Sequence, residues 1–396
     1  MPITVTDNTF TSSTTSEAPS TFVAGMVSFN GLVRLFGTTG SNGTSESEIG
    51  LMTVSSLTDW FSRLYSKPYG ISGPTAGWAN EWWAVHNYLQ YGGICVVGGT
   101  GSTGDYYSAN GGLSAFNTPL HNKSLVAIDA VFDSGTTASV ESIINIAKTR
   151  EDCVAVVGNY KKITGVPGLA ANYSGQTADF GFNETNPYVV YVAGRKKFVA
   201  GIGSEVNILE SDLSPDVAGC MARSNRDQNI WASPAGKTRG RILGVVSLQQ
   251  NFTESDSNYI YGGGVNPVSV IPGQGTFLLG NKTSYTSTSS LSKINIIMMV
   301  VYIKKQLLSI AQDLLFEIND SATRQKMITA AIPILENVKA GNGITEYRIV
   351  CDETNNTASV IAAGRLVIDV YLNPTYTAET IQLSIINSTV SEAFIA

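Results

Sequence analysis

The segment that decides the fold is SLVAIDAVFDSGTTASVESIINIAKTREDCVAVVG, residues 124–158. It begins with an apolar strand pattern at 124–132, continues with helical spacing over 138–149 and ends in a second apolar run at 152–158. A strand, a helix and a strand in this order are typical of parallel sheets that are covered by helices. The segment therefore predicts a mixed α/β fold around this unit.

The chain on the N-terminal side of this unit shows the same alternation. Strands are expected at 21–29 and 94–99, and helices at 56–65 and 77–91, where apolar residues recur at helical spacing. Because strands and helices alternate throughout, we predict one α/β domain over 21–205.

Both ends of the chain look like strands that lack a partner nearby in the sequence. Residues 1–20 are polar, with Ile3 and Val5 at alternating positions, and residues 379–396 contain a strand pattern carried by Ile381, Leu383 and Ile385. An unpaired strand can complete a sheet in another chain, so we predict two terminal arms that donate strands between subunits. Ordinary frayed termini are the alternative on the pattern alone.

A second domain is predicted over 206–378, where the texture of the sequence changes. Residues 293–318 are expected to form a strand, INIIMMVVYI, that runs into a long helix. Asp320 is expected to cap a following helix over 321–339. Two further strands are expected at 346–353 and 365–374.

The composition points to a chain that packs against other protein. Hydrophobic residues make up 43% of the 396 residues and charged residues only 14%, which is below the usual quarter. The net charge of −6 argues against direct nucleic-acid binding, which needs a basic face. The ten-residue apolar run at 294–303 is too short to span a bilayer, so no membrane insertion is expected.

The residue types that metal sites and histidine-based catalysis need are scarce. His86 and His121 are isolated, and the four cysteines have no metal-binding spacing, which predicts small buried hydrophobic residues in a reduced protein. These cysteines are Cys95, Cys153, Cys220 and Cys351. We expect no metal, no cofactor and no catalytic residue.

Three patterns imitate chemistry. The run from Gly99 to Gly104 matches GxGxxG after a strand, but a loop-like segment follows where a helix is needed. Gly236-Lys237-Thr238 matches the end of the phosphate-binding motif GxxxxGK[ST]. The first glycine of that motif is missing, because Trp231 occupies its position. The cluster of Asp216, Arg223 and Asp227 is expected to be salt-bridged at a surface or an interface rather than catalytic.

An ordered series of short motifs in the second half makes the chain recognisable. It runs from Asp216-Val217-Ala218-Gly219 through Ser233-Pro234-Ala235-Gly236 and Phe316-Glu317-Ile318-Asn319-Asp320 to Val350-Cys351-Asp352-Glu353-Thr354-Asn355. This series, over about 206–375, resembles the contractile tail sheath proteins of bacteriophages. The signature positions are Arg223, Trp231, Pro234, Gly236, Arg239, Asp352 and Asn355.

The resemblance implies a structural subunit that polymerises as stacked six-membered rings around a tail tube. In such a sheath the domain over 206–378 lies against the tube, the domain over 21–205 faces outward, and the arms complete sheets in neighbours. Contraction then drives the tube through the host envelope. The implied partners are other copies of the chain, the tail tube protein, and the baseplate and tail-terminator proteins, and the implied location is the virion tail sheath after assembly in the host cytoplasm.

Two alternatives stay open from the sequence. The chain can instead be the sheath of a related non-phage contractile injection system, or a nucleotide-binding α/β enzyme that uses the glycine-rich loop after 94–99.

A departure from the family concerns its basic residues. Members often carry paired arginines after the Asn-Ile/Val strand, whereas Asn295-Ile296 is followed here by Ile297-Met298-Met299. We predict that Lys304 and Lys305 face the tube in their place, with a solvated helix face as the alternative.

Overall fold

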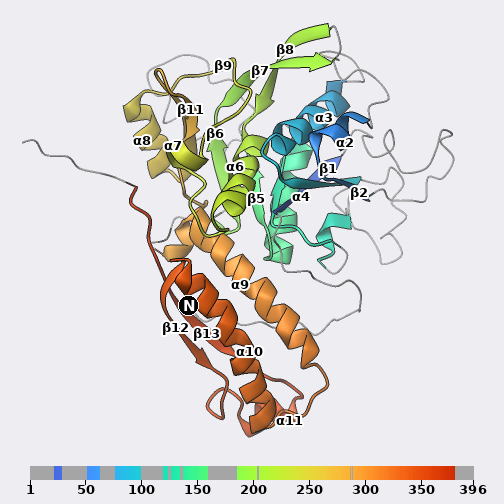
Figure 1. Cartoon of the computed structure of the whole chain (residues 1–396), viewed down its shortest axis with the longest axis vertical. Helices are drawn as coiled ribbons and strands as arrows, with labels where there is room; N and C mark the ends of the chain where they lie inside the picture. Colours follow the sequence, from blue (N-terminus) through green and yellow to red (C-terminus); the bar gives the residue numbers. More distant parts are fainter. Residues whose placement is uncertain are drawn as a thin grey trace, which may run out of the picture.

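The computed structural model describes the residues 22–28, 51–62, 76–99, 119–123, 126–133, 137–158, 185–202, 205–285, 287 and 289–379. The described chain is elongated, with a large sheet and its helices in the upper part of Figure 1 and two long helices in the lower part. The arm positions Ile3, Val5, Ile381, Leu383 and Ile385 lie outside the described residues.

A central sheet of eight strands organises the upper part. Its strand order is β11-β10-β6-β5-β4-β1-β3-β2. The inner neighbours pair in parallel, and the antiparallel strands β2 and β11 close the two edges. The strands are β1 Val23–Ser28, β2 Leu51–Val54, β3 Ile94–Gly99, β4 Ala130–Phe132, β5 Val154–Val157, β6 Val189–Ala193, β10 Val265–Ile271 and β11 Gly275–Leu278.

The predicted strand–helix–strand unit is confirmed. Helix α4 (Thr137–Arg150) connects β4 to β5, and these two strands are parallel neighbours in the sheet. Helices α2 (Leu57–Ser62) and α3 (Ala76–Leu89) also form near the predicted positions.

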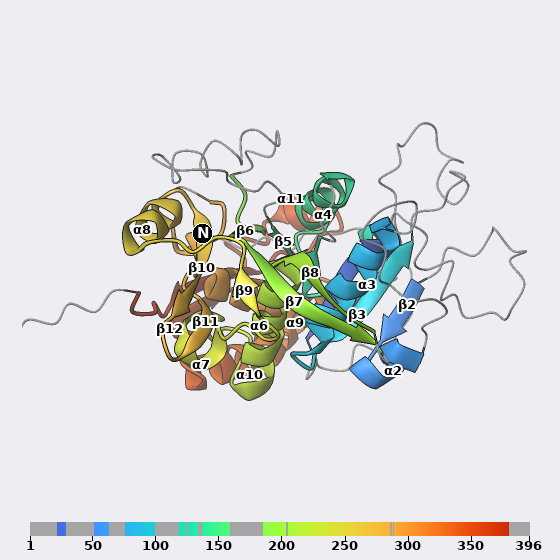
Figure 2. The same cartoon turned by 90° about the horizontal axis from the view of Figure 1, so that it is seen from above.

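Helices cover both faces of the central sheet, as Figure 2 shows. Successive side chains of a strand point to opposite faces. Val154 and Val156 belong to the core beneath α3 and α6 (Ser214–Asp227), whereas Ala155 and Val157 belong to a second core that contains α4 and Ile260 of α8 (Glu254–Gly262). Since both faces are buried, the parallel strands read as continuous apolar runs.

The sheet does not stop at the predicted division between residues 205 and 206. Strand β10 pairs in parallel with β6, and β11 follows it, so residues on both sides of the division build one sheet. The sequence suggested a boundary there because glycine-rich and polar loops interrupt the apolar pattern. The assignment of an outer and an inner part therefore cannot follow this sheet, and it stays a prediction about the assembly.

A second, smaller sheet caps the end of the central sheet. It has the order β8-β7-β9, from β7 (Arg195–Ile202), β8 (Glu205–Asp212) and β9 (Ser247–Leu248). Its inner face buries Phe198 and Ala200. Its outer face leaves Val199 and Ile208, which are cross-strand partners, more than half exposed.

The lower part, which we call the C-terminal body, comprises residues 289–379. It contains α9 (Ile294–Asp313), α10 (Ser321–Ala340), α11 (Ala358–Ala362) and the antiparallel pair of β12 (Ile344–Val350) and β13 (Asp369–Pro374). The expected helix cap is confirmed, because the Asp320 carboxylate accepts a hydrogen bond from the Thr323 amide at 2.7 Å. Core residues of α9 and α10 join the core beneath α3 and α6, so both parts of the molecule share one hydrophobic core.

The strand predicted for INIIMMVVYI is wrong. These residues form the first half of α9, which is one helix from Ile294 to Asp313. Its first six residues are all buried, so the segment is apolar on every side and shows no helical periodicity. This helix is also long and apolar enough to cross a membrane, but half of its most apolar window is buried inside the protein, as in a core helix.

Candidate functional site

The segment 229–242 joins the two parts of the molecule. Trp231 is buried, and its indole N–H donates a hydrogen bond of 2.8 Å to the carbonyl of Gly341, just after α10. A side chain at Gly341 or Gly343 would collide with the indole ring, so the tryptophan fits only against bare backbone there. Tyr302 of α9 packs on the indole at 5.7 Å. The tryptophan thus anchors this segment in the C-terminal body.

The two signature arginines hold the rest of the segment through backbone carbonyls. Arg239 donates to the carbonyl of Ser233 at 2.6 Å and to Gln228 at 2.8 Å. Arg223 of α6 donates to the carbonyls of Arg239 and Arg241 and lies 5.1 Å from the ring centre of Tyr91. Arg223 was expected to take part in a salt bridge, and that expectation is wrong, because its guanidinium donates to backbone carbonyls instead.

Pro234 and Gly236 shape the turn inside this segment. Gly236 has a φ of +90°, a region that favours glycine, and it begins the four-residue helix α7 (Gly236–Arg239). Gly236, Lys237 and Thr238 therefore lie in this short helix, which is placed beside α6.

Asp352 and Asn355 fix the connection between β12 and β13. The Asp352 carboxylate accepts hydrogen bonds from the Thr354 amide and hydroxyl, which lowers the pKa of Asp352. Asn355 donates to the carbonyl of Val350 at 2.8 Å and to Asp369 at 3.0 Å. Because Val350 ends β12 and Asp369 begins β13, this signature motif ties the two strands together.

The pair of β12 and β13 is the smallest sheet in the described part of the chain. Each strand pairs only with the other there, and no third described strand adds to either edge. Tyr347, Ile349 and Leu372 pack toward the core, while Glu346, Arg348 and Tyr371 are exposed. A two-stranded sheet is marginal by itself, so both of its edges can take up further strands.

Asp216 is not at a surface, which corrects the expectation from the sequence. It is fully buried in α6, where it pairs with Lys196 at 2.8 Å and accepts a hydrogen bond from the Tyr91 hydroxyl at 2.9 Å. Burial raises the pKa of Asp216, and the charge of Lys196 opposes that shift. Arg226 and Asp227 do form an exposed ion pair at the end of the same helix.

A second buried group of charges, which contains two neighbouring carboxylates, was not detectable in the sequence. Asp212 ends β8 beside Asp133, and burial together with the Asp133 charge raises the pKa of Asp212 well above its usual range. The Asp212 carboxylate forms an ion pair with Arg195 at 3.5 Å. The three residues come from distant positions in the sequence, and only the docking of β7 and β8 onto the central sheet brings them together.

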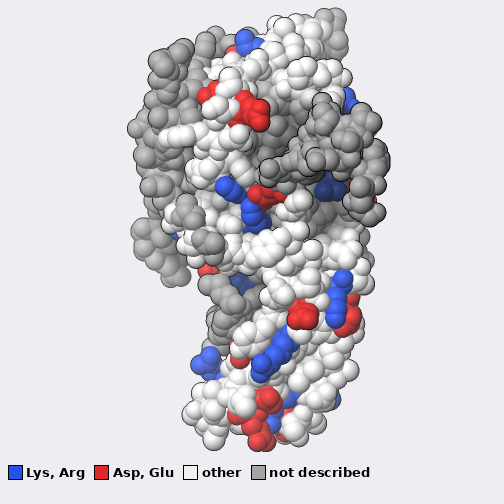
Figure 3. Space-filling model, turned by 90° about the vertical axis from the view of Figure 1, so that its left-hand side faces the viewer, with Lys and Arg blue, Asp and Glu red and all other residues white. Residues whose placement is uncertain are grey.

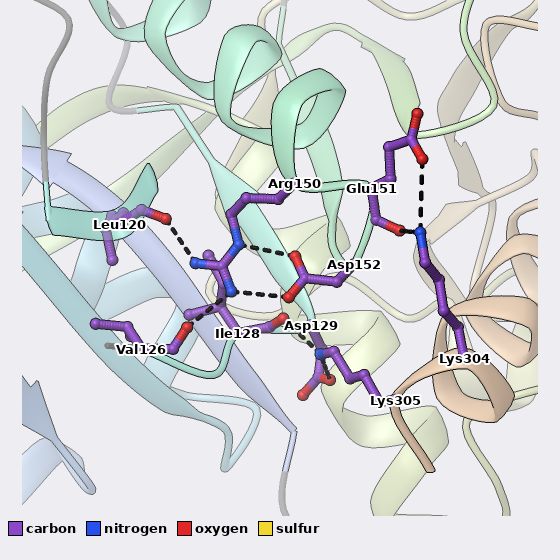
Figure 4. Close-up of polar contacts among 9 residues, drawn as sticks. All are labelled: Leu120, Val126, Ile128, Asp129, Arg150, Glu151, Asp152, Lys304 and Lys305. Atoms are coloured by element: carbon purple, nitrogen blue, oxygen red, sulfur yellow. Dashed lines mark hydrogen bonds and ion pairs between the residues drawn. The ribbon is translucent and has the colours of Figure 1, made fainter. Parts of the chain in front are cut away.

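Lys304 and Lys305 lie where α9 meets the central sheet, and both bind within the chain (Figure 4). Lys305 donates to the carbonyl of Ile128 at 2.6 Å and forms an ion pair with Asp129 at 2.8 Å. Lys304 contacts the carbonyl and the carboxylate of Glu151. Both lysines are about one-fifth exposed, and a tube-facing role for them stays a prediction.

Arg150 rigidifies the same junction from the other side. Its buried guanidinium forms two hydrogen bonds with Asp152 and donates to the carbonyls of Leu120 and Val126 (Figure 4). Because these carbonyls belong to the chain that leads into β4, the arginine fixes the start of this interior strand, close to Asp129 and its contact with α9.

The visible surface is weakly charged. In Figure 3, acidic and basic side chains are interspersed over the C-terminal body, and neither sign gathers into a broad patch on that face. Within the described residues, no group of three or more potential metal-binding side chains occurs. All four cysteines are buried and unpaired, as the sequence predicted.

Comparison with known proteins places the chain. Two family models match it in succession: the phage tail sheath protein central domain over residues 110–284 and the phage tail sheath C-terminal domain over residues 286–386. The chain is 30% identical over 253 residues to the tail sheath protein of Enterobacteria phage T4, and 29% identical over 301 residues to that of Vibrio phage KVP40. The chain belongs to the phage tail sheath family. Its relatives are structural sheath proteins and not enzymes, which excludes the nucleotide-binding enzyme as an interpretation.

The chain is much shorter than these phage relatives. The matched regions take up 62% of this chain but 38% of the T4 protein, and 72% of this chain but 45% of the KVP40 protein. It therefore spans less than half the length of the curated sheath proteins that it resembles.

Solved sheath structures match over nearly the full chain. The contracted sheath of the PVC extracellular contractile injection system has a TM-score of 0.68 at 14% identity, with 98% of each chain covered. The helical sheath of the anti-feeding prophage in its contracted state has a TM-score of 0.66 at 15% identity, and all of that chain is covered. At these identities the likeness shows that the fold is shared.

Proposed function

We propose that the chain is the subunit of a contractile tail sheath, which polymerises as stacked six-membered rings around a tail tube. The observation that carries this proposal is the incomplete sheet of β12 and β13, because it offers two edges in a chain whose terminal segments have strand patterns. The arms over 1–20 and 379–396 add strands to such sheets in neighbouring subunits.

In this assembly, contraction moves the subunits while the arms keep them linked. No cofactor is involved, since the energy comes from the packing of the subunits themselves. A contracted state that buries more apolar surface gains roughly 25 cal/mol per Å², and even a small gain adds up over many subunits. The weakly charged surface and the exposed Val199 and Ile208 suit a protein that packs against copies of itself.

The remaining partners follow from the same assembly. The sheath surrounds a tail tube, begins at a baseplate and ends at a tail terminator, and the subunits assemble in the host cytoplasm before they become part of the virion tail. Contact with nucleic acid and insertion into a membrane have no place in this function.

A non-phage contractile injection system is the second candidate. The observation that favours it is the fold, because the sheath structures of two injection systems match 98% of this chain with TM-scores of 0.68 and 0.66. Purified particles distinguish the two, because a phage tail carries a DNA-filled head and an injection device does not.

Removal of the arms tests the assembly. Full-length purified protein is expected to form striated tubes of constant width in electron micrographs. Chains that lack 1–18 or 380–396 should remain folded, with an unchanged thermal midpoint, and stay monomeric. Glu379 is retained in the second truncation because it contacts Lys293. Truncated chains that polymerise like the full chain would contradict the proposed exchange of strands.

The predicted tube contact has its own test. Lys304→Glu is the cleaner variant, because its partner Glu151 is more than half exposed to water, whereas reversal of Lys305 would place a second carboxylate beside the buried Asp129. The Lys304 variant should form sheath tubes but attach more weakly to purified tail tubes in a co-sedimentation assay. Unchanged attachment would remove Lys304 from the tube-binding surface.

A further inference from the structure

The described ends of the chain are both held by lysines of one helix. Val23 begins β1, directly after the segment predicted as the N-terminal arm, and Glu379 is the last described residue before the C-terminal strand pattern. We call the positions around these two residues the arm roots. The first root contacts Lys305 of α9 through Asp129, and the second contacts Lys293, the residue that precedes α9.

The N-terminal root is fixed by a buried carboxylate. One Asp129 oxygen accepts a hydrogen bond from the Val23 amide at 3.0 Å, and the other pairs with Lys305 at 2.8 Å. The Asp129 amide donates in turn to the Val23 carbonyl at 2.7 Å. The neighbouring Phe22 is buried, and its carbonyl accepts from the Ile94 amide and the Tyr88 hydroxyl. These contacts fix the start of β1 relative to α9.

The C-terminal root is attached at every second residue. The Thr375 amide donates to the carbonyl of Gly343 at 3.0 Å, and the Thr377 hydroxyl accepts from Asn281 at 3.5 Å. Glu379 then pairs with Lys293 at 2.5 Å. Contacts at alternate residues are typical of an extended chain, so the body guides these residues toward the strand pattern that follows.

Aromatic and basic groups surround the Glu379 carboxylate. The Tyr261 hydroxyl forms a hydrogen bond to it, which adds to burial in raising the pKa of Tyr261. Lys282 lies 4.1 Å from the centre of the Tyr261 ring and donates to the Tyr261 carbonyl. The Lys293 and Glu379 side chains are only 20% and 25% exposed, so the contact is better shielded from solvent than an ordinary surface ion pair.

We propose that α9 is a spacer that positions both terminal arms, with Lys293 holding the C-terminal root and Lys305 holding the N-terminal root. Lys305 follows Lys293 by twelve residues, which places the two anchors about 18 Å apart along a single rigid helix. The arms of one subunit thus leave from points whose separation does not change when the subunit moves. This inference rests on the proposed strand exchange, and it names the residues that aim the arms.

Three matched variants of full-length protein test the spacer: Lys293→Gln, Lys305→Gln and the control Lys304→Gln. Lys304 lies on the same helix and forms its ion pair with Glu151, which contacts neither root. In assembly without tube, the first two variants should raise the critical concentration for tube formation by about fivefold, and the control by less than about twofold. Equal behaviour of all three would overturn the proposal.

Two further measurements separate positioning from folding. The Lys293→Glu variant combined with Glu379→Lys should restore assembly, because the pair is reformed with reversed charges, and failure to restore it would contradict the anchor. In monomeric protein, Lys305→Gln should speed hydrogen exchange of the Val23 amide several-fold relative to amides far from the root, such as those of β12, while Lys304→Gln leaves this ratio unchanged. If wild-type protein forms no tubes, the proposed function fails, whereas the monomer exchange rates still decide whether the anchor exists.

Discussion

The central sheet and the sheet of the C-terminal body differ in how their faces and edges are covered. The eight-stranded sheet is broad, and helices cover both of its faces. The pair of β12 and β13 has one covered face and no further strand among the described residues. Under the proposed exchange of strands, the difference has a purpose: one chain holds a finished domain beside a sheet that a neighbouring chain completes.

Charges follow the same division. The central part buries Lys196, Asp216 and much of His86 inside the protein, whereas the signature acids of the C-terminal body, Asp320 and Asp352, lie at its surface. A buried charge depends on its partner, while a surface charge has water as a substitute. Removing the buried charges of the central part should therefore be costly, and removing the surface acids Asp320 and Asp352 should be mild.

The largest effect is expected for Lys196→Met. Asp216 would keep its burial but lose its cation, and removal of one partner of a buried ion pair costs about 3–5 kcal/mol. Urea unfolding at pH 7 measures the loss. The control is Lys197→Met, because Lys197 is the neighbouring residue with an exposed pair to Glu210, and it should cost no more than about 1 kcal/mol.

A double variant sharpens this result. Combining Lys196→Met with Asp216→Asn removes the charge that the first substitution leaves unpaired, so part of the lost stability should return. If the single and double variants are equally unstable, the loss reflects the packing of the lysine stem rather than the charge.

Acid should destabilise the central part through His86. Burial among aromatic rings, helped by the charge of Lys196, lowers the pKa of His86 to about 4. The unfolded chain takes up a proton near pH 6.5, and the folded chain does so only near pH 4, so stability falls as the pH drops through this window. The fall amounts to about 3 kcal/mol. His86→Phe should flatten the pH dependence of urea unfolding over this range, and an unchanged slope would show that other groups cause it.

A smaller loss is expected where the two parts meet. Trp231→Phe keeps most of the apolar contact with Tyr302 but removes the hydrogen bond to the Gly341 carbonyl. The free energy of unfolding should fall by about 1–2 kcal/mol. Separate unfolding transitions for the central part and the C-terminal body in calorimetry would show that Trp231 also couples their unfolding. A single sharp transition at the wild-type midpoint would contradict the role of this hydrogen bond.

The sequence predicted most of the fold because its signals are local. Strands β4 and β5, helix α4 between them and the Asp320 cap each depend on neighbouring residues, and all of them form, although β4 is limited to the last three residues of the strand predicted at 124–132. The segment 294–303 was mistaken for a strand because burial of its first six residues erases the periodicity that distinguishes a helix from a strand. The pairing of β10 with β6 across position 206 was not expected, because it is a long-range event that leaves no local mark in the sequence.

Little of the candidate site was predictable from residue type alone. Arg223 was expected in a salt bridge, but it donates to the carbonyls of Arg239 and Arg241, which only the folded chain brings to α6. The partners of Lys305 and Asp216 could not be predicted, since Asp129 and Lys196 meet them through the packing of separate elements. Lys293 and Glu379 gave no signal beyond an ordinary lysine and an ordinary glutamate, although the position of Glu379 at the start of the last strand pattern was visible.

The smallest effect is expected at the surface of the C-terminal body, and it completes the comparison. Hydrogen bonds from Thr323 lower the pKa of Asp320, so the cap stabilises α10 at neutral pH and weakens as the pH falls through the folded-state pKa. Asp320→Ala should cause a slight loss of stability at pH 7 that disappears in acid, and Asp320→Asn should behave like the wild type at pH 7, because asparagine caps equally well. Denaturant unfolding at several pH values measures both. A loss for Asp320→Ala as large as that for Lys196→Met would show that the C-terminal body is no more tolerant of charge removal than the central part.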